Sequence, residues 1–461
     1  MPLILGTNSI KDTGYNVANS LRFNDGDTAS LSKTPSSNGS NTVWTVSMWC
    51  KRSHITTDQK LHAAGTSATY ELLFSDVDQL TLYNGSTTVF VTNRVFRDVS
   101  AWLHVVVSYN TGASGTDKCK LFINGTLETS FATDNRSSAG AMNHINQSSQ
   151  AQFVGNNDAG NGFDGYIAEV CVIDGTALVA TSFGEFDSDS PTIWKPIDVS
   201  GLTFGTNGFY LDFEDSSNLG NDANGGTDLT ENNLAATDQS TDTCTNNFAT
   251  FNSLDVSSVS SNGTTFTEGN LKVTDGSSNY LVATGTMAVT QGKWYFEVKI
   301  DATASNTASG VAIVDLDGWD RTDGATNSVY GWLYASDGDK RSNSSSTAYG
   351  DTYAANDIIG VAIDMDNTSV YFSKNGTFQA SGDPTSGSSK TNAAFTNLTG
   401  TITAQVYDGS SGQAHEFSMN FGSPPYSISS GNTDANGHGN FEYAVPSGYF
   451  ALCTKNLAEF G

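Results

Sequence analysis

The chain has 461 residues, and 48 acidic side chains against 21 basic ones give it a formal net charge of −27. Such a charge repels phosphate backbones and therefore argues against direct nucleic-acid binding. With 46 glycines and only 8 prolines, the composition is typical of many short strands joined by polar turns. We expect an all-β chain of roughly two to four domains, at about 100–200 residues per domain.

The chain begins with a short apolar segment, Met1 to Asn19, whose hydrophobic residues fit no strand pattern of their own. One hypothesis is that this segment docks onto a neighbouring chain, which would make the protein a homo-oligomer. The other is that it forms a strand of its own domain. The opening MPLILGTNSIKDTG has no basic stretch and predicts no secretory signal. No run approaches the ~18 apolar residues of a membrane span, so we expect no membrane insertion.

Five strand units follow between residues 21 and 175, each ending in a turn dipeptide. The apolar stretches are LRF at Leu21, WTVSMWC at Trp44, YELLF at Tyr70, LHVVVSY at Leu103 and YIAEVCVI at Tyr166. The dipeptide Asn124-Gly125 is a strong hairpin signal. The five cysteines are widely spaced, contain no CxxC pair, and are expected to be reduced thiols of a protein made in the cytosol: Cys50, Cys119, Cys171, Cys244 and Cys453.

Five motifs in this part of the chain resemble a laminin-G-like (concanavalin-A-like) sandwich: FNDG at Phe23, WTVSMWCKR at Trp44, WLHVVVSYNT at Trp102, LFING at Leu121 and FDGYIAEVCVIDG at Phe163. The resemblance covers residues 20–186 and implies a jelly-roll fold with a concave sheet. Members of this family bind glycans or proteins, some with Ca²⁺ at the rim. It makes Asp27 and Asp164 the candidate Ca²⁺ ligands, although a turn aspartate is the simpler interpretation of both.

Residues 187–254 are rich in Asn, Asp, Thr and Gly, yet they contain Trp194, Phe204, Phe209, Tyr210 and Phe213. So many aromatic residues are unusual for a disordered linker. We therefore expect an ordered bridging segment, held against one or both domains by these side chains. Its composition resembles connectors between modules of tailed-phage virion proteins.

A second series of strands occupies residues 255–461 and is organised around the stretch Asn356 to Phe378. Alternation over Ile359, Val361 and Ile363 predicts a strand. The turn Asp366-Asn367 favours a left-handed backbone, and Asn375-Gly376 predicts a hairpin. Together with WYFEV at Trp294, ITAQVYDG at Ile402 and NFG-PPY from Asn420, this series resembles a SPRY (B30.2-type) domain. We therefore expect two β-sandwiches in series.

The closing stretch VPSGYFALCTKNLAEFG resembles the end of phage-encoded SPRY proteins. The order of the two modules, the connector and this ending resembles a tailed-phage virion surface protein. That resemblance places the protein on the virion surface, made in the host cytoplasm, with other virion proteins as partners.

Catalytic signals are weak in this sequence. Sandwich glycosidases carry Glu-x-Asp-x-Glu, and the nearest string, Glu185 to Ser190, lacks the final glutamate needed for a carboxylate pair. His104 follows Trp102 within a strand and is expected to be a hydrogen-bonded sheet residue rather than a base. We expect no enzymatic activity.

The densest carboxylate cluster lies between Asp315 and Gly324. It is not an EF-hand, because Trp319 occupies a ligand position and no Glu stands at the twelfth. The simpler interpretation is a polar loop after a strand. The functional hypothesis is a binding loop in which an exposed tryptophan stacks on a sugar or anchors a protein; its residues are Asp315, Asp317, Trp319, Asp320 and Asp323.

From these observations and resemblances we expect a non-enzymatic virion protein that attaches to host-surface glycans or proteins as part of a tail fibre or appendage. Many weak contacts on many copies would give avidity. Two alternatives remain open: a capsid or tail decoration protein that packs mainly against other virion proteins, and a sandwich-type polysaccharide depolymerase.

Overall fold

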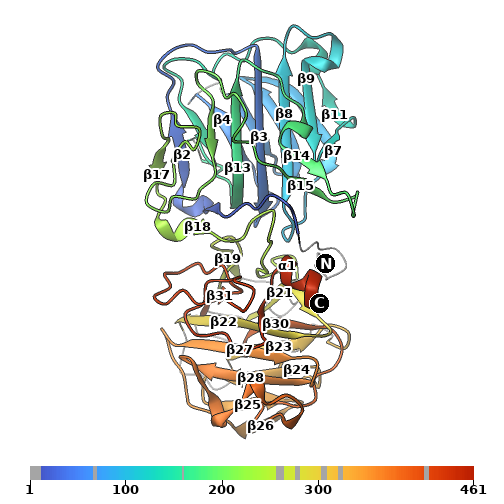
Figure 1. Ribbon diagram of the computed structural model, residues 1–461, viewed down its shortest axis with the longest axis vertical. Coiled ribbons are helices and arrows are strands. Elements are labelled where there is room, and N and C mark those ends of the chain that lie inside the picture. The colour runs from blue at the N-terminus through green and yellow to red at the C-terminus, as the bar shows by residue number, and fades with distance from the viewer. Residues whose placement is uncertain are drawn as a thin grey trace. The chain divides into compact units, whose positions relative to one another are not determined.

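In the computed structural model, the described residues are 12–65, 70–157, 160–255, 264–275, 281–302, 309–319, 325–409 and 415–461. The chain divides into two compact units, one formed by Thr13–Asn246 and the other containing Asn247–Gly461. Each unit is built from antiparallel sheets (Figure 1). The all-β fold and the two sandwiches in series are therefore confirmed.

The first unit is a sandwich of two sheets with strand orders β10-β9-β8-β3-β13-β1-β18 and β11-β7-β6-β5-β4-β12-β2-β17. The strands of the first sheet are β1 (Ser20–Phe23), β3 (Val43–Arg52), β8 (Leu103–Asn110), β9 (Cys119–Ile123), β10 (Thr126–Leu127), β13 (Gly165–Asp174) and β18 (Gln239–Ser240), with β16 (Phe209–Leu211) also paired to β13. Those of the second are β2 (Ser30–Lys33), β4 (Gln59–Ala64), β5 (Tyr70–Phe74), β6 (Gln79–Asn84), β7 (Thr87–Val95), β11 (Phe131–Asp134), β12 (Gln152–Val154) and β17 (Thr230–Asn232).

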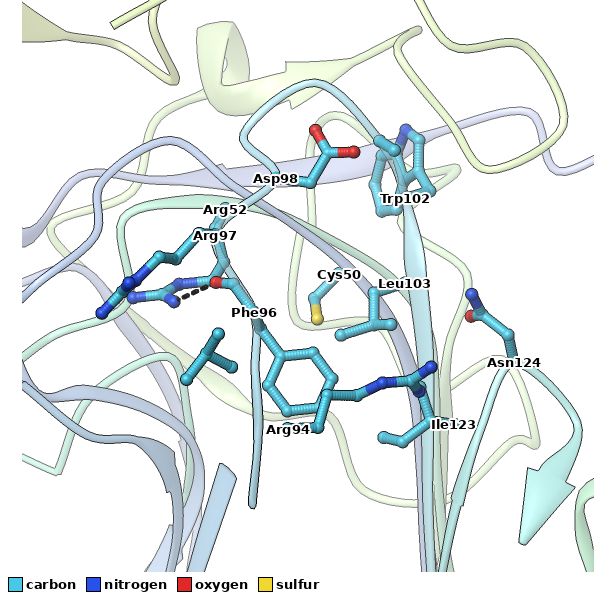
Figure 2. A pocket seen from close by; sticks show the side chains of 12 residues that line it. Cys50, Arg52, Arg94, Phe96, Arg97, Asp98, Trp102, Leu103, Ile123 and Asn124 are labelled. Atoms are coloured by element: carbon cyan, nitrogen blue, oxygen red, sulfur yellow. Dashed lines mark hydrogen bonds between the residues drawn. The ribbon is translucent and has the colours of Figure 1, made fainter. Parts of the chain in front are cut away.

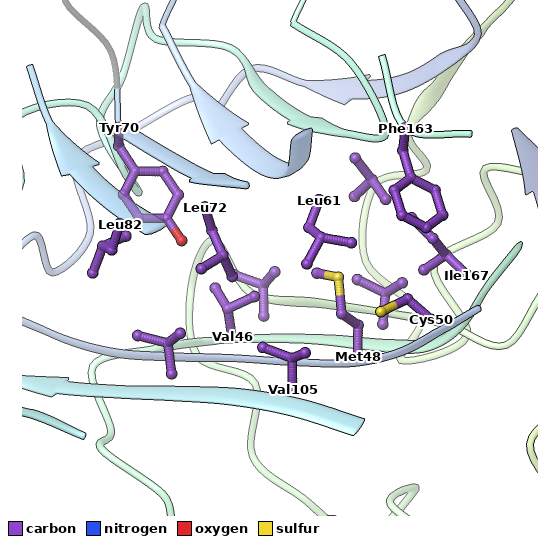
Figure 3. Close-up of a cluster of buried hydrophobic side chains, with 14 of the residues drawn as sticks. Val46, Met48, Cys50, Leu61, Tyr70, Leu72, Leu82, Val105, Phe163 and Ile167 are labelled. Atoms are coloured by element: carbon purple, nitrogen blue, oxygen red, sulfur yellow. The ribbon is translucent and has the colours of Figure 1, made fainter. Parts of the chain in front are cut away.

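Strand β3 has bulky residues on both faces because both faces are covered. Val46, Met48 and Cys50 point into the core between the sheets, where they meet Leu61 and other side chains of the second sheet (Figure 3). The alternate side chain, Trp49, belongs to a second buried cluster on the outer face of the first sheet. Period-two alternation places consecutive side chains on opposite faces, so one strand serves both layers.

The Asn/Asp-rich segment supplies much of that outer layer. Trp194, Phe204 and Tyr210 are buried in it, and Phe209 and Phe213 are buried in the core between the sheets. Strands β16, β17 and β18 of this segment pair with β13, β2 and β1. A separate hairpin joins β14 (Gly184–Phe186) to β15 (Trp194–Pro196). Up to Asn246 the segment is thus part of the first unit, and only its last residues belong to the other.

The described part of the N-terminal segment also packs on the first unit. Val17 is buried in the outer layer, and its backbone N–H donates to Thr245 Oγ1 at 3.1 Å. At Val17 the structure therefore agrees with the alternative that the segment packs on its own domain. Residues 1–11 lie outside the described residues, so the docking of the rest of the segment Met1 to Asn19 stays a prediction.

The second unit has two sheets with strand orders β19-β20-β31-β22-β27-β28-β29 and β21-β30-β23-β24-β25-β26. The first comprises β19 (Thr265–Thr267), β20 (Lys272–Thr274), β22 (Lys293–Ala302), β27 (Ile358–Asp364), β28 (Ser369–Lys374), β29 (Thr377–Phe378) and β31 (Glu416–Asn420), with β32 (Phe450–Ala451) parallel to β22. The second comprises β21 (Leu281–Val289), β23 (Gly310–Asp315), β24 (Gly331–Ala335), β25 (Asp339–Ser342), β26 (Ser345–Ala348) and β30 (Ile402–Asp408). Tyr334 of β24 and Phe372 of β28 meet across the sheets, with ring centroids 5.6 Å apart.

The hairpin signals are confirmed at backbone level. Asn124-Gly125 and Asn375-Gly376 all have positive φ, between 46° and 79°, as the tight turn requires. The turn after β27 differs from its prediction, because Thr368 rather than Asp366 or Asn367 takes the left-handed conformation, at φ 53°. Asp364 accepts the Asn367 N–H at 2.9 Å and shapes this turn.

Helical structure is limited to short segments in the described part of the chain. One α-helix, α1 (Thr454–Phe460), lies near the C-terminus. The 3-10 helices are Asp25–Asp27, Gly115–Lys118, Arg136–Ser138, Ala180–Ser182, Ala236–Asp238, Gln379–Ser381 and Pro384–Ser389. No helix among the described residues is long and apolar enough to cross a membrane. All five cysteines are free thiols, as expected.

Candidate functional site

Three strand ends of the first sheet bring candidate ligand groups together. Neighbouring strands β3, β13 and β1 pair so that Arg52 and Phe23 both lie opposite Gly165. Asp25 follows β1, His54 follows β3 and Asp164 precedes β13, so all three lie at one rim. One potential ligand atom from each lies within 4.8 Å of the others.

This rim cluster does not have the composition of a calcium site. Ca²⁺ takes six to eight oxygen ligands, whereas imidazole suits zinc, copper, iron or nickel. The described cluster offers two carboxylates and an imidazole. Asp164 is only 5% exposed and already accepts the Ser53 hydroxyl at 2.7 Å. The other predicted ligand, Asp27, lies outside the cluster and accepts from the side chain of Asn24.

The two described carboxylates of the predicted loop in the second unit, those of Asp315 and Asp317, are bonded to their own fold. Asp315 is 2% exposed, and its side chain accepts bonds from Thr399 Oγ1 at 2.9 Å and Thr401 N at 3.0 Å. Asp317 accepts from Thr401 Oγ1 at 3.0 Å. These two residues therefore tie the loop after β23 to the residues before β30. Asp320 and Asp323 lie outside the described residues.

The expectation of an exposed Trp319 is wrong. Its side chain is 3% exposed and packs in a cluster with Val314, Leu333 and Tyr407, on the outer face of the sheet that contains β23, β24 and β30. The Trp319 N–H donates to Asp315 O at 3.0 Å, which turns the chain back over the sheet. A side chain enclosed in this way presents no face for stacking on a sugar.

His104 is a hydrogen-bonded sheet residue, as predicted. Trp194 Nε1 donates to its Nδ1 at 2.9 Å, and its Nε2 lies 2.9 Å from Ser47 Oγ. Burial lowers the pKa of His104 to about 3, so the ring stays neutral near pH 7. Asp187, from the Glu185 to Ser190 string, accepts the Ser190 N–H at 2.8 Å in the β14–β15 turn. That hydrogen bond is the largest of several effects that lower the pKa of Asp187.

Sequence reasoning missed a recess of about 320 Å³ in the first unit (Figure 2). It lies where β3 and β9 end and β8 begins, the same end of the first sheet as the rim cluster. Its lining residues are Cys50, Arg52, Arg94, Val95, Phe96, Arg97, Asp98, Ala101, Trp102, Leu103, Ile123 and Asn124. The sequence signal was RVFRD at Arg94, two arginines and an aromatic residue in a chain with few basic residues.

The floor of this pocket is apolar because it reaches the core of the sandwich. Cys50, Phe96 and Ile123 are members of the buried core cluster, and Leu103 packs against it. Polar side chains surround this floor. Trp102 forms part of the wall and is held in place by its indole N–H, which donates to Asp242 Oδ1 at 3.0 Å. Such a pocket, apolar with a few convergent polar groups, is typical of small-molecule sites.

Comparison with known proteins identifies both modules. The model of the concanavalin A-like lectin/glucanases superfamily matches residues 24–181, and that of the SPRY domain matches residues 293–422. The chain therefore carries a concanavalin A-like domain followed by a SPRY domain. None of the curated proteins matches the sequence.

Among solved structures, the chain is similar to the SPRY domain of human HERC1, with 18% identity over 32% of this chain and 87% of that one, at a TM-score of 0.27. It is also similar to stonustoxin, with 15% identity over 37% of this chain and 27% of that one, at a TM-score of 0.28.

Proposed function

We propose that this chain is a non-enzymatic recognition protein of a tailed-phage virion, which attaches to host-surface glycans through its concanavalin A-like domain. The observation that carries the proposal is the pocket at the end of the first sandwich. It combines an apolar floor, an aromatic wall and several hydrogen-bonding groups at the rim. A sugar ring presents the matching surfaces, since it has both an apolar C–H face and hydroxyl groups.

The other polar candidates support binding rather than catalysis. The side chains of His104, Asp187 and Asp315 are all engaged in bonds that hold the fold together. The virion location is supported by the resemblance of the closing segment to phage-encoded SPRY proteins. Copies arrayed on a particle would convert weak binding at single sites into firm attachment.

A glycan array tests the attachment. The full chain, displayed in many copies on beads, should bind a subset of host glycans. The substitution Ala101→Trp adds a large side chain to the lining of the pocket and should reduce binding by roughly tenfold or more. Ala113→Trp is the matched control, because Ala113 is also half-buried but lies beyond the opposite end of β8.

Absence of glycan binding by the full chain would refute the attachment. Equal loss of binding in both variants would refute the assignment to this pocket. Antibody labelling of intact particles tests the virion location, and lack of label would refute it. Protection of the antibody epitopes by other virion proteins until the particle is disrupted would instead favour the decoration protein.

A further inference from the structure

The pocket in the concanavalin A-like domain concentrates positive charge in a strongly acidic chain. The whole sequence has 7 arginines, and three of them, Arg52, Arg94 and Arg97, line this one pocket. A single buried carboxylate, Asp78, pairs with two of them, at 3.1 Å from Arg52 Nη1 and 2.8 Å from Arg97 Nε.

Arg94 is the arginine that remains available. Its described contact is with the ring of Phe96, whose centroid lies 5.9 Å from the guanidinium carbon, and no carboxylate in the described part of the chain pairs with it. In Figure 2 its side chain extends past Phe96 towards Leu103 and Ile123, whereas Arg52 and Arg97 lie on the other side of that ring. An exposed guanidinium beside an apolar floor favours a ligand with an anionic group on an apolar body.

The rim also offers one donor and one acceptor suited to hydroxyl groups. Asn124 Oδ1 accepts the His104 N–H at 2.7 Å, which fixes the amide and leaves Nδ2 without a partner among the described residues. Asp98 Oδ1 accepts the Ser100 N–H and hydroxyl, so Oδ2 has no bond within the described part of the chain. A ligand that carried only a carboxylate and an apolar body would bond to neither Asn124 Nδ2 nor Asp98 Oδ2, whereas the hydroxyl groups of a sugar can bond to both.

We propose that this pocket binds the carboxylate-bearing sugar of an acidic saccharide, with the carboxylate held by Arg94 and the ring over Phe96, Leu103 and Ile123. The inference rests on the proposed function and names its ligand class. A volume of about 320 Å³ lies at the lower end of the range for ligand pockets and suits one sugar residue with part of its neighbour.

The test compares two probes that differ only at the carboxylate, methyl β-glucuronide and methyl β-glucoside, titrated into the full chain and followed by NMR. The glucuronide should bind roughly tenfold more tightly at low salt, as for one charged hydrogen bond. Because Arg94 is exposed, the preference should narrow as salt screens the charge. Arg94→Gln should abolish it, and Arg94→Lys should retain part of it.

Lys118→Gln is the matched control, since it removes one positive charge just before β9 begins, whereas the pocket is lined by Ile123 and Asn124 at the other end of that strand. It should leave the preference unchanged. Equal binding of the two probes, or a preference that survives Arg94→Gln, would overturn the proposal. So would tighter binding of hexanoate or of an acidic peptide. If Arg94→Gln left binding to the glycan array unchanged, attachment to glycans would still be supported, and only the assignment of an acidic saccharide as the ligand would be refuted.

Discussion

The carboxylate of Glu169 accepts a 2.8 Å hydrogen bond from the hydroxyl of Tyr210, within the layer that covers the outer face of the first sheet. Glu169 stands at a β-bulge of β13, where the pairing with β3 shifts register, and has φ 51°. Its side chain is only 5% exposed. Burial is the main cause that raises the pKa of Glu169 to about 8.

This raised pKa predicts a pH-dependent stability of the first domain. Between about pH 4.5, the usual pKa of glutamate, and pH 8, the folded state retains a proton that the unfolded state has released. The free energy of unfolding should therefore fall as pH rises through this window, by up to about 1.4 kcal/mol per pH unit. Glu169→Gln keeps an acceptor for Tyr210 and should remove this dependence.

Hydrogen exchange of the β13 amides from pH 5 to 8.5, corrected for intrinsic rates, measures the effect. The exposed Glu231→Gln is the control and should behave like the unmodified chain. A variant at Glu169 with the same pH profile as the unmodified chain would contradict the prediction.

Removing the buried carboxylate of Asp78 should lower the free energy of unfolding more than removing its exposed partner Arg97. Burial raises the pKa of Asp78, but hydrogen bonds from Thr56, Arg97 and Arg52 outweigh it and leave the pKa below its usual value. The stabilisation is thus present near neutral pH and lost as pH falls through the lowered pKa. Asp78→Asn would leave the charge of Arg52 buried without compensation and should cost about 3–5 kcal/mol.

Urea unfolding at pH 7 measures this cost. Arg97→Gln is the comparison, because its side chain is 56% exposed and should cost at most about 1 kcal/mol. An equal loss of unfolding free energy in Asp78→Asn and Arg97→Gln would contradict a larger contribution from the buried pair Arg52–Asp78.

Gly125 should tolerate substitution less well than another glycine of the same domain. Gly125 and Gly115 both have positive φ, 76° and 56°, so alanine is strained by about 1–2 kcal/mol at either. At Gly125 a Cβ would also lie 2.2 Å from the ring of Trp194, whereas at Gly115 nothing lies within 4 Å. Gly125→Ala should therefore cost about 1–3 kcal/mol more than Gly115→Ala. Thermal unfolding of the two variants compares them, and equal destabilisation would exclude the steric contribution.

Glu297 in the SPRY domain should hold the segment that follows β31. Its carboxylate accepts the N–H groups of Glu442 at 3.0 Å and Tyr443 at 2.8 Å, and the Asn420 side chain at 3.1 Å. Glu297→Ala would leave these donors unsatisfied, at about 1–3 kcal/mol for each one that stays buried. Exchange of the Glu442 and Tyr443 amides should accelerate. Glu416→Ala, whose carboxylate is 29% exposed, is the control. Unchanged exchange at these two amides would contradict the assigned role.

Local sequence was sufficient for the strands and for the two Asn-Gly hairpins, but not for the turn after β27, where Thr368 takes the left-handed conformation. The alternation of Ile359, Val361 and Ile363 and the dipeptides at Asn124 and Asn375 depend on neighbours a few residues away. The structure has the predicted strand and both hairpins. The two families could likewise be identified, because ordered motifs preserve the succession of strands. The composition of the Asn/Asp-rich segment likewise predicted that its aromatic side chains hold it against a domain, and these side chains are buried in the first unit.

The pocket, the rim cluster and the burial of Trp319 could not be predicted from local sequence, because each depends on contacts between residues far apart in the chain. Nothing near Trp319 in the sequence shows that Leu333 and Tyr407 enclose it. The rim cluster forms only because β1, β3 and β13 become neighbours. The pocket forms only because the ends of β3 and β9 meet the end of β7, which carries Arg94. Side-chain exposure and the pairing of charges are properties of the packed sheets, since strand register decides which residues face each other. The sequence by itself therefore determined the elements and their families, and the tertiary structure alone decided which polar groups remain available to a ligand.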